Sequence, residues 1–198
     1  MAAEGISEIS LKGELLRKLT HIGALSIPAI YYILGREIIL ALLGIAFLIA
    51  STVDLTRLFG GDRSRHIIHK LFGIMIRPRE KKDFTGATYI LASSIITILI
   101  FEKTIAVLAL VYIIVGDTAG AIVGRMWGKI KFRNKTLEGS LSFFVSCSLV
   151  ALIIPGIPLW IKISGALAAA VVEALTVYID DNLTVPIMSA AIMQLLAG

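Results

Sequence analysis

Residues 115–140, VGDTAGAIVGRMWGKIKFRNKTLEGS, decide how this chain folds. Glycine recurs there at every fourth position, as Gly116, Gly120, Gly124 and Gly128. Residues four apart share one face of a helix, so this stripe without side chains lets another backbone approach closely. Asp117 borders the stripe inside an apolar run, and a carboxylate in lipid is costly enough that it normally serves function. The stretch predicts a closely packed helix that carries a functional acid.

A cationic loop follows that helix and ends in a K-T-x-E-G turn. Its basic residues are Arg125, Lys129, Lys131, Arg133 and Lys135. Cations beside a carboxylate at a membrane surface suit a metal-bound phosphate group. The G-x-x-x-x-G that precedes Lys-Thr in a phosphate-binding loop is absent, which excludes a P-loop fold. We interpret Lys135 as a contact to phosphate oxygens and Glu138 as a contact to a metal or ribose.

The composition is that of an integral membrane protein. Hydrophobic residues make up 57% of the 198 residues and charged residues 17%, with a mean hydropathy of +0.89. The length leaves no room for a separate catalytic domain, so a site must be built from membrane helices and short loops. Cys147 is the single cysteine, which excludes an internal disulfide and a cysteine-based metal site. We attribute the net charge of +5 to cytoplasmic loops and anionic headgroups, not to nucleic acid.

The predicted fold is all-α, with about seven transmembrane helices in a single polytopic domain, 1–198. The expected spans are 22–35, 38–53, 84–101, 104–124, 139 into the 154–158 region, 163–179 and 184–198. The expected non-spanning parts are an amphipathic lead-in, 1–18, and cytoplasmic loops at 55–83, 125–138 and 180–183. In the first loop, apolar and basic side chains alternate as in a basic amphipathic helix lying in the membrane interface. Its apolar face holds Ile67, Ile68, Leu71, Phe72 and Met75, and its basic face holds Arg63, Arg65, His66, His69 and Lys70.

The distribution of positive charge predicts the orientation. With the N-terminus in the cytoplasm, sixteen of the nineteen Lys and Arg residues fall on the inside, a strong positive-inside signal. Residues 1–13 carry Glu4 and Glu8 without an apolar core, so no cleavable signal is expected. The same orientation places every polar motif on one side. We therefore expect a multi-pass protein, in the cell membrane if prokaryotic, with its active site facing the cytoplasm.

Further carboxylates follow near the C-terminus. Asp180, Asp181 and Asn182 offer hard oxygen ligands beside the positive end of the last helix, an arrangement that suits Mg²⁺-phosphate. The alternative is a polar turn that caps the helix. Glu173 precedes Asp180 by seven residues and shares its face if the helix continues. Its candidate roles are metal ligand, supporting group and proton carrier. For Asp117 the alternative is a structural ion pair with a neighbouring lysine.

The N-terminal polar residues share one helix face. The spacing i, i+3, i+4 and i+7 relates Glu14, Arg17, Lys18 and His21. This shared face favours contact between His21 and the site, and the alternative is an interfacial histidine without a functional role. His66 and His69 are assigned to a solvated basic face, because their spacing gives little support to zinc. Asp54 is expected to pair with Arg57 at i+3.

At this point the motifs resemble the CTP-dependent polyprenol kinase family, which includes dolichol, phytol and farnesol kinases and the CTP-using yeast diacylglycerol kinase. The shared motifs are E-x-x-R-K-x-x-H at 14–21, R-P-R-E…T-G-A-T-Y at 77–89, G-D-T-A-G-A-x-x-G-R-x-x-G at 116–128, K-T-x-E-G-S at 135–140 and E…D-D-N-L-T-V-P at 173–186. Together they cover most of the chain in order. The long additional N-terminal helices of eukaryotic dolichol kinases are absent from this sequence.

The resemblance implies that the loop after the G-D-T helix holds CTP. The residues it implies for nucleotide binding are Lys135, Thr136, Glu138, Gly139, Arg125, Lys129, Arg133 and Asn182. Those implied for Mg²⁺ are Asp117, Asp180, Asp181 and Glu173, and those implied for catalysis are Asp117, Asp181 and Lys135. Those implied for substrate contact or support are Glu14, Arg17, Lys18, His21, Arg77 and Glu80.

The expected reaction is phosphoryl transfer from CTP to the hydroxyl of a polyprenol whose tail lies in the bilayer. Asp117 or Asp181 would orient or deprotonate that hydroxyl. A cytidylyltransferase that makes a CDP-lipid would use the same ions and nucleotide but attack the α-phosphorus. A small ion- or proton-coupled transporter would use Asp117 and Glu173, but it leaves the K-T-x-E-G and D-D-N turns unexplained. The sequence carries no sign of the oligomeric state.

Overall fold

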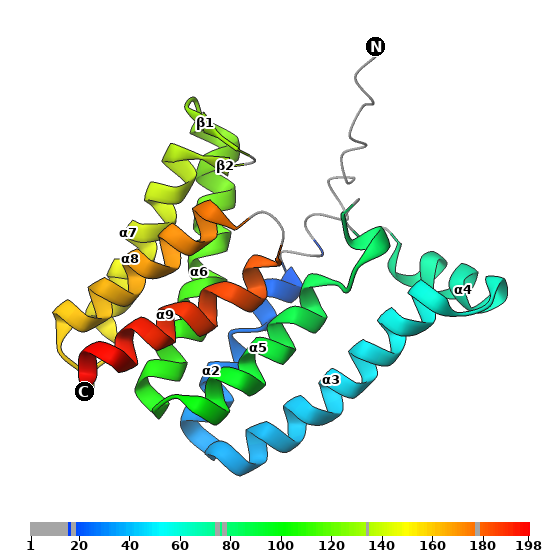
Figure 1. Cartoon of the computed structure of the whole chain (residues 1–198), viewed down its shortest axis with the longest axis horizontal. Coiled ribbons are helices and arrows are strands. Elements are labelled where there is room, and N and C mark those ends of the chain that lie inside the picture. The colour runs from blue at the N-terminus through cyan, green and yellow to red at the C-terminus, as the bar shows by residue number, and fades with distance from the viewer. Residues whose placement is uncertain (1–15, 17–18, 74–75, 77–78, 134, 177–178) are drawn as a thin grey trace.

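The computed structural model describes residues 16, 19–73, 76, 79–133, 135–176 and 179–198 (Figure 1). Within them the chain is helical, apart from one short hairpin. The elements are α2 (Ser26–Leu34), α3 (Arg36–Phe59), α4 (Asp62–Phe72), the 3₁₀ turn η1 (Arg79–Lys82), α5 (Gly86–Ile100), α6 (Lys103–Trp127), β1 (Lys131–Phe132), β2 (Lys135–Thr136), α7 (Leu137–Ile153), α8 (Leu159–Leu175) and α9 (Asp181–Ala197). The all-helical prediction is confirmed.

Helix α6 is the centre of the bundle. Ile105, Leu108 and Tyr112 on its first half have no exposed surface. It contacts α2, α5, α7, α8 and α9, and α9 crosses in front of it in Figure 1. Since the first half of α6 is apolar on every side, it can be buried by neighbours all round. Its second half, which carries Asp117, leads toward the hairpin.

Each of the seven segments predicted to span forms a helix, but their crossing of a membrane is shown only in part. Among the described residues, two helices are long and apolar enough to cross, α3 and α6, with mean hydropathies of 2.4 and 2.2. The segments 19–34, 86–100 and 137–153 are apolar but shorter. The seven-span topology therefore stays a prediction.

The outer surface of the bundle supports a membrane setting. Ile45, Leu48 and Ile49 on α3 are each at least 60% exposed. Leu141, Val145 and Leu149, four residues apart on α7, form a second exposed apolar stripe. Apolar surface of this extent is unfavourable in water but is expected against lipid.

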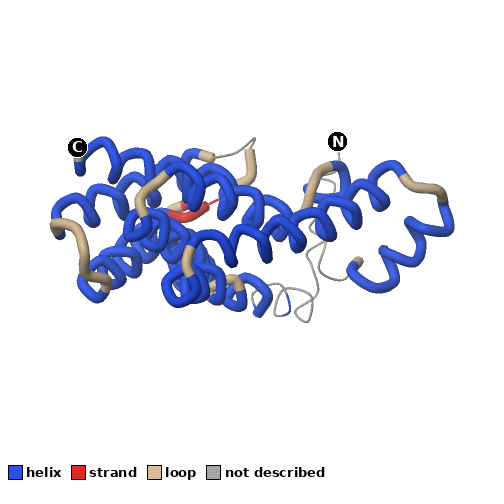
Figure 2. The backbone as a smooth tube through the Cα atoms, turned by 90° about the horizontal axis from the view of Figure 1, so that it is seen from below, coloured by secondary structure: helices blue, strands red, loops and turns tan. Residues whose placement is uncertain are grey.

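The segment predicted to be amphipathic forms α4 and η1. Helix α4 stands apart from the bundle at the end of α3 (Figures 1 and 2). Ile67, Leu71 and Phe72 are exposed along its apolar face, as an interfacial helix requires. Met75 lies outside the described residues, as does the predicted lead-in 1–18 apart from Leu16.

Candidate functional site

The glycine stripe holds α6 against α7, as predicted. A Cβ atom on Gly120 would lie 3.1 Å from the Gly139 carbonyl oxygen, and one on Gly116 would lie 2.6 Å from the Phe143 ring. The backbones can approach this closely because neither glycine has a side chain. The β1–β2 hairpin between the two helices brings Lys135 back beside the Asp117 end of α6.

Three carboxylates from three helices meet next to the hairpin. They are Asp117 of α6, Glu173 of α8 and Asp181 of α9, and one oxygen of each lies within 4.8 Å of the others. Glu173 and Asp181 are only 5% and 7% exposed. Like charges held this close in a buried site need a cation to balance them.

Lys135 supplies part of that balance. Its Nζ lies 2.5 Å from Glu173 Oε1 and 3.0 Å from Asp181 Oδ2. Burial by itself would lower the pKa of the Lys135 ammonium, but the charges of Asp181 and Glu173 outweigh burial, and its pKa is raised. Three carboxylates against one ammonium leave two formal negative charges, with His21 counted as neutral. A cation bound by hard oxygen ligands would balance them, so these residues fit Mg²⁺.

His21 reaches this cluster from the N-terminal side. Its Nε2 lies 3.7 Å from Asp117 Oδ2, and its side chain is 11% exposed. Nε2 has no hydrogen-bond partner among the described residues. The sequence prediction that His21 approaches the site therefore agrees with this geometry. Its predicted companions Glu14, Arg17 and Lys18 lie outside the described residues.

The C-terminal acids are arranged differently from the expectation. Helix α8 ends at Leu175, so Glu173 and Asp180 do not share the face of one continuous helix. Packing of α8 against α9 brings Glu173 to Asp181 instead. Asp180 is the N-cap of α9, and its Oδ1 accepts from the backbone N and side-chain Nδ2 of Asn182 at 3.0 and 2.7 Å. The capping alternative thus describes Asp180, which stands outside the cluster of three carboxylates.

The remaining predicted nucleotide contacts lie along the hairpin and the first turn of α7. Thr136 caps α7 by accepting from Gly139 N at 3.2 Å. Glu138 accepts from Ile130 N and is not part of the carboxylate cluster. Arg133 donates to the Leu175 carbonyl at 2.8 Å and adopts a positive φ of 54°. Arg125 and Lys129, which precede the hairpin in the chain, are exposed.

Two polar groups in this region were missed by sequence reasoning. Ser140 Oγ donates to Glu173 Oε2 at 3.4 Å, and it is the last residue of the K-T-x-E-G-S motif. The second is Asp54, interpreted only as the partner of Arg57. That pair is confirmed, at 3.0 Å, but Asp54 Oδ2 also accepts from Thr85 N, Thr85 Oγ1 and Thr88 Oγ1. An acid at the end of an apolar run was the available signal.

The Asp54 network extends to the first site through backbone contacts. Arg57 donates to the carbonyl oxygens of Glu80 and Asp83 at 2.7 and 2.6 Å. Glu80 Oε1 in turn accepts from Gly86 N at 3.1 Å. A Cβ atom on Gly86 would lie 2.9 Å from Asn182 Nδ2, so α5 begins in direct contact with the start of α9. Glu80 thus contacts the start of α5 and its supporting role stays a prediction, while Arg77 lies outside the described residues.

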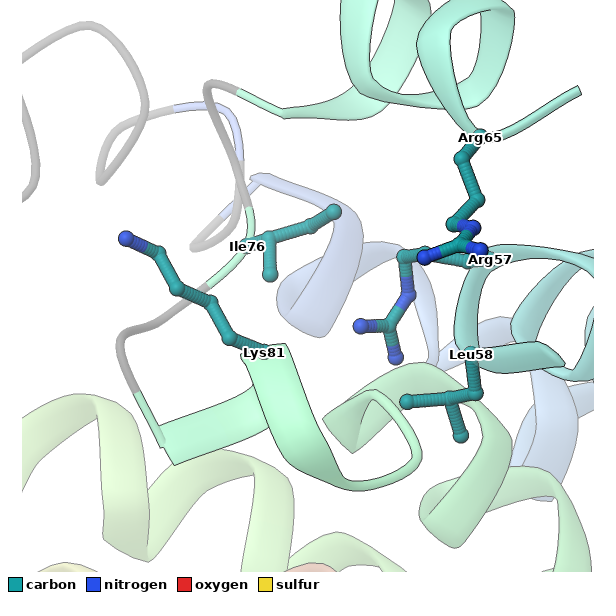
Figure 3. A pocket seen from close by; sticks show the side chains of 5 residues that line it. All are labelled: Arg57, Leu58, Arg65, Ile76 and Lys81. Carbon is teal, nitrogen blue, oxygen red and sulfur yellow. The ribbon is translucent and has the colours of Figure 1, made fainter. Parts of the chain in front are cut away.

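A basic pocket adjoins the Asp54 network. Its volume is about 230 Å³, and it is lined by Arg57, Leu58, Arg65, Ile76 and Lys81 (Figure 3). Arg57 faces Asp54, Arg65 Nε donates to the Gly60 carbonyl at 2.7 Å, and the Lys81 amino group points away from both arginines. The two arginines are thus engaged with the protein, and the pocket is a junction between α3, α4 and η1.

Comparison with known proteins supports the kind of enzyme that the motifs resemble. The chain is 29% identical to CTP-dependent diacylglycerol kinase 1 of Schizosaccharomyces pombe, over 96% of each chain. It is 24% identical to the protein of that name from Saccharomyces cerevisiae, over 96% of this chain and 76% of the relative. These similarities support the CTP-dependent lipid kinase family. An uncharacterised protein of Methanocaldococcus jannaschii is 36% identical over 59% of this chain. No family model and no solved structure matches.

The comparisons change one expectation. The resemblance seen in the motifs centred on polyprenol kinases, whereas the relatives with a named activity are diacylglycerol kinases. The comparisons support the predicted kind of kinase, but they do not confirm a polyprenol as the acceptor.

Proposed function

We propose that this protein transfers the γ-phosphoryl group of CTP to the hydroxyl of a membrane lipid. The observation that carries the proposal is the meeting of Lys135 with Asp117, Glu173 and Asp181, from the hairpin and three separate helices. Phosphoryl transfer depends mainly on positioning and charge neutralisation, which this combination of groups can supply. Similarity to CTP-dependent diacylglycerol kinases supports CTP as the phosphate donor.

Each group in the cluster has a proposed role. Lys135 binds phosphate oxygens, since its ammonium stands at the edge of the cluster with 28% of its side chain exposed. Asp117, the most exposed of the three acids at 18%, orients the acceptor hydroxyl and accepts its proton, with Asp181 as the alternative. Glu173 and Asp181, held by Lys135, keep the ammonium in place. Bound Mg²⁺ would neutralise phosphate charge, held by Asp117, Glu173 and Asp181.

The acceptor is either a diacylglycerol or a prenyl alcohol. The relatives named as diacylglycerol kinases support the first, and the motif resemblance to polyprenol kinases supports the second. Both are lipid alcohols whose hydroxyl lies at the membrane surface. We place the site on the cytoplasmic face, because the cationic segments that flank it carry most of the positive charge.

CTP labelled at either the γ- or the α-phosphate tests the reaction. Purified protein in detergent–lipid micelles receives CTP and, in parallel, a diacylglycerol or a prenyl alcohol. The kinase proposal requires γ-label in the lipid and none from the α-position. Transfer of α-label would instead establish the cytidylyltransferase alternative. Lys135→Ala is expected to abolish transfer, while Asp62→Asn, a change at an exposed acid on α4, serves as the matched control.

A further inference from the structure

An apolar groove lies between α2, α3 and α5. Its volume is about 320 Å³, and its lining includes Ile27 and Ile30 of α2, Leu42 and Ala46 of α3, and Ile90 of α5. Thr20 and Ser26 contribute hydroxyls, and that of Thr20 already donates to the Leu16 carbonyl. The groove therefore offers hydrocarbon contact and few hydrogen-bonding groups.

One end of the groove adjoins the candidate site. Thr20 lines the groove and directly precedes His21, whose Nε2 lies 3.7 Å from Asp117 Oδ2. Ala87 lines it from the other side and directly follows Gly86, which abuts Asn182. On each side of the groove, a lining residue is therefore adjacent in sequence to a residue that contacts Asp117 or Asn182.

The groove leads away from the site into the apolar part of the bundle. Asp54 of α3 accepts a hydrogen bond from Thr88 in the first turn of α5, and this contact marks the polar end of both helices. Ala46 lies eight residues before Asp54, so it is about 12 Å below that level at the helical rise of 1.5 Å per residue. The groove extends further to Ile39, on the same helix.

The chemistry of the groove selects its occupant. A peptide would bring backbone N–H and C=O groups, which need hydrogen-bond partners that an apolar lining cannot give. Next to the groove, α3 exposes Ile45 and Ile49, so the groove opens onto surface that faces lipid. A hydrocarbon chain can enter from there without losing hydrogen bonds.

From this geometry we infer that the groove holds one hydrocarbon chain of the lipid alcohol and directs its hydroxyl toward Asp117. The inference rests on the proposed kinase function and adds where the acceptor lies. Ala46 is then a specificity-determining position, because its small side chain leaves the middle of the groove open. A second chain of a diacylglycerol would remain in the bilayer.

Two substitutions change the groove in opposite directions. Ala46→Phe fills it, and we expect the KM for a long-chain lipid alcohol to rise about tenfold, as for a blocked hydrophobic pocket. The KM for CTP and the turnover of a short-chain, water-soluble acceptor should stay unchanged. Leu42→Ala widens the groove and should raise kcat/KM for an acceptor with a branched chain relative to a straight one.

Ala41→Phe is the matched control, since Ala41 is exposed on the same helix and does not line the groove. If Ala46→Phe and Ala41→Phe give the same dependence on chain length, the groove does not hold the acceptor chain. Leu42→Ala decides the question if Ala46→Phe does not fold, because unchanged chain preference in that variant also contradicts the inference.

Photolabelling separates this inference from the kinase proposal. A lipid alcohol with a diazirine at the end of its chain is expected to label peptides of α2, α3 and α5, and excess unlabelled lipid alcohol should prevent the labelling. Excess of a lipid without a hydroxyl should not prevent it. Labelling spread evenly over α7 and α8 would contradict binding of the chain in the groove, whether or not phosphate is transferred. Absence of transfer with groove labelling intact overturns the kinase proposal alone.

Discussion

The Asp117–Glu173–Asp181 cluster and the Asp54 network are both buried acids with a basic partner, yet their hydrogen bonding differs. Asp54 is 2% exposed and accepts from two guanidinium nitrogens of Arg57, two hydroxyls and a backbone N–H. In the cluster, Lys135 donates to Glu173 and Asp181, Ser140 donates to Glu173, and three carboxylates lie close together around this one ammonium. A saturated acid, with donors on both oxygens, holds structure together, whereas a cluster with excess negative charge can bind a cation.

The largest expected effect is on the cluster of Asp117, Glu173 and Asp181. Asp181→Asn removes a charge that holds Lys135, and we expect kcat to fall about a thousandfold, or about 4 kcal/mol in the barrier. The Tm in detergent should be unchanged or higher, because like charges are separated. Steady-state transfer of γ-label and a thermal melt measure both quantities. A variant with normal turnover would show that Asp181 has no part in transfer.

A substitution in the Asp54 network should lower the stability of the protein. Asp54→Ala leaves the buried Arg57 guanidinium without its carboxylate, which costs about 3 kcal/mol in the free energy of unfolding. Thermal unfolding in detergent measures the loss, with Asp62→Asn as the exposed control. A lower kcat for Asp54→Ala at an unchanged Tm would contradict the assignment of Asp54 to stability and of the Asp117–Glu173–Asp181 cluster to transfer.

The close contact that positions the cluster is expected to tolerate little added volume. Gly120→Ala places a methyl group 3.1 Å from the Gly139 carbonyl oxygen, so α6 and α7 must separate slightly, at a cost of about 2 kcal/mol. Activity should fall as well, because the hairpin carries Lys135. Gly44→Ala on α3, where nothing lies within 4 Å of the added atom, is the matched control. Equal Tm values for the two variants would contradict this account of the stripe.

The smallest effect is expected at the cap of α7. Thr136→Ala removes the hydroxyl that accepts from Gly139 N, which should cost about 1 kcal/mol. Thr136→Ser keeps that acceptor and should restore the Tm. Restored stability with reduced activity would indicate that the lost methyl group also contacts nucleotide.

Several parts of the fold could be predicted from local sequence alone. The seven apolar segments, the glycine stripe and the Asp54–Arg57 pair follow from spacing along one helix, and spacing is visible in the sequence. The boundaries of α8 could not be predicted in the same way. Its apolar run continues to Ile179, but the helix ends at Leu175, and α9, which begins at Asp181, packs back against α8.

The sequence by itself predicted the candidate side chains: Asp117 and Glu173 as acids inside apolar runs, Lys135 in a cationic loop and Asp181 in a polar turn. Only the tertiary structure decided that Asp181 joins Glu173 and Lys135 while its neighbour Asp180 caps α9. The physical reason is that capping needs an acceptor at one position of the helix start, and adjacent residues there point in different directions. Distances between helices likewise depend on packing, which no local pattern contains.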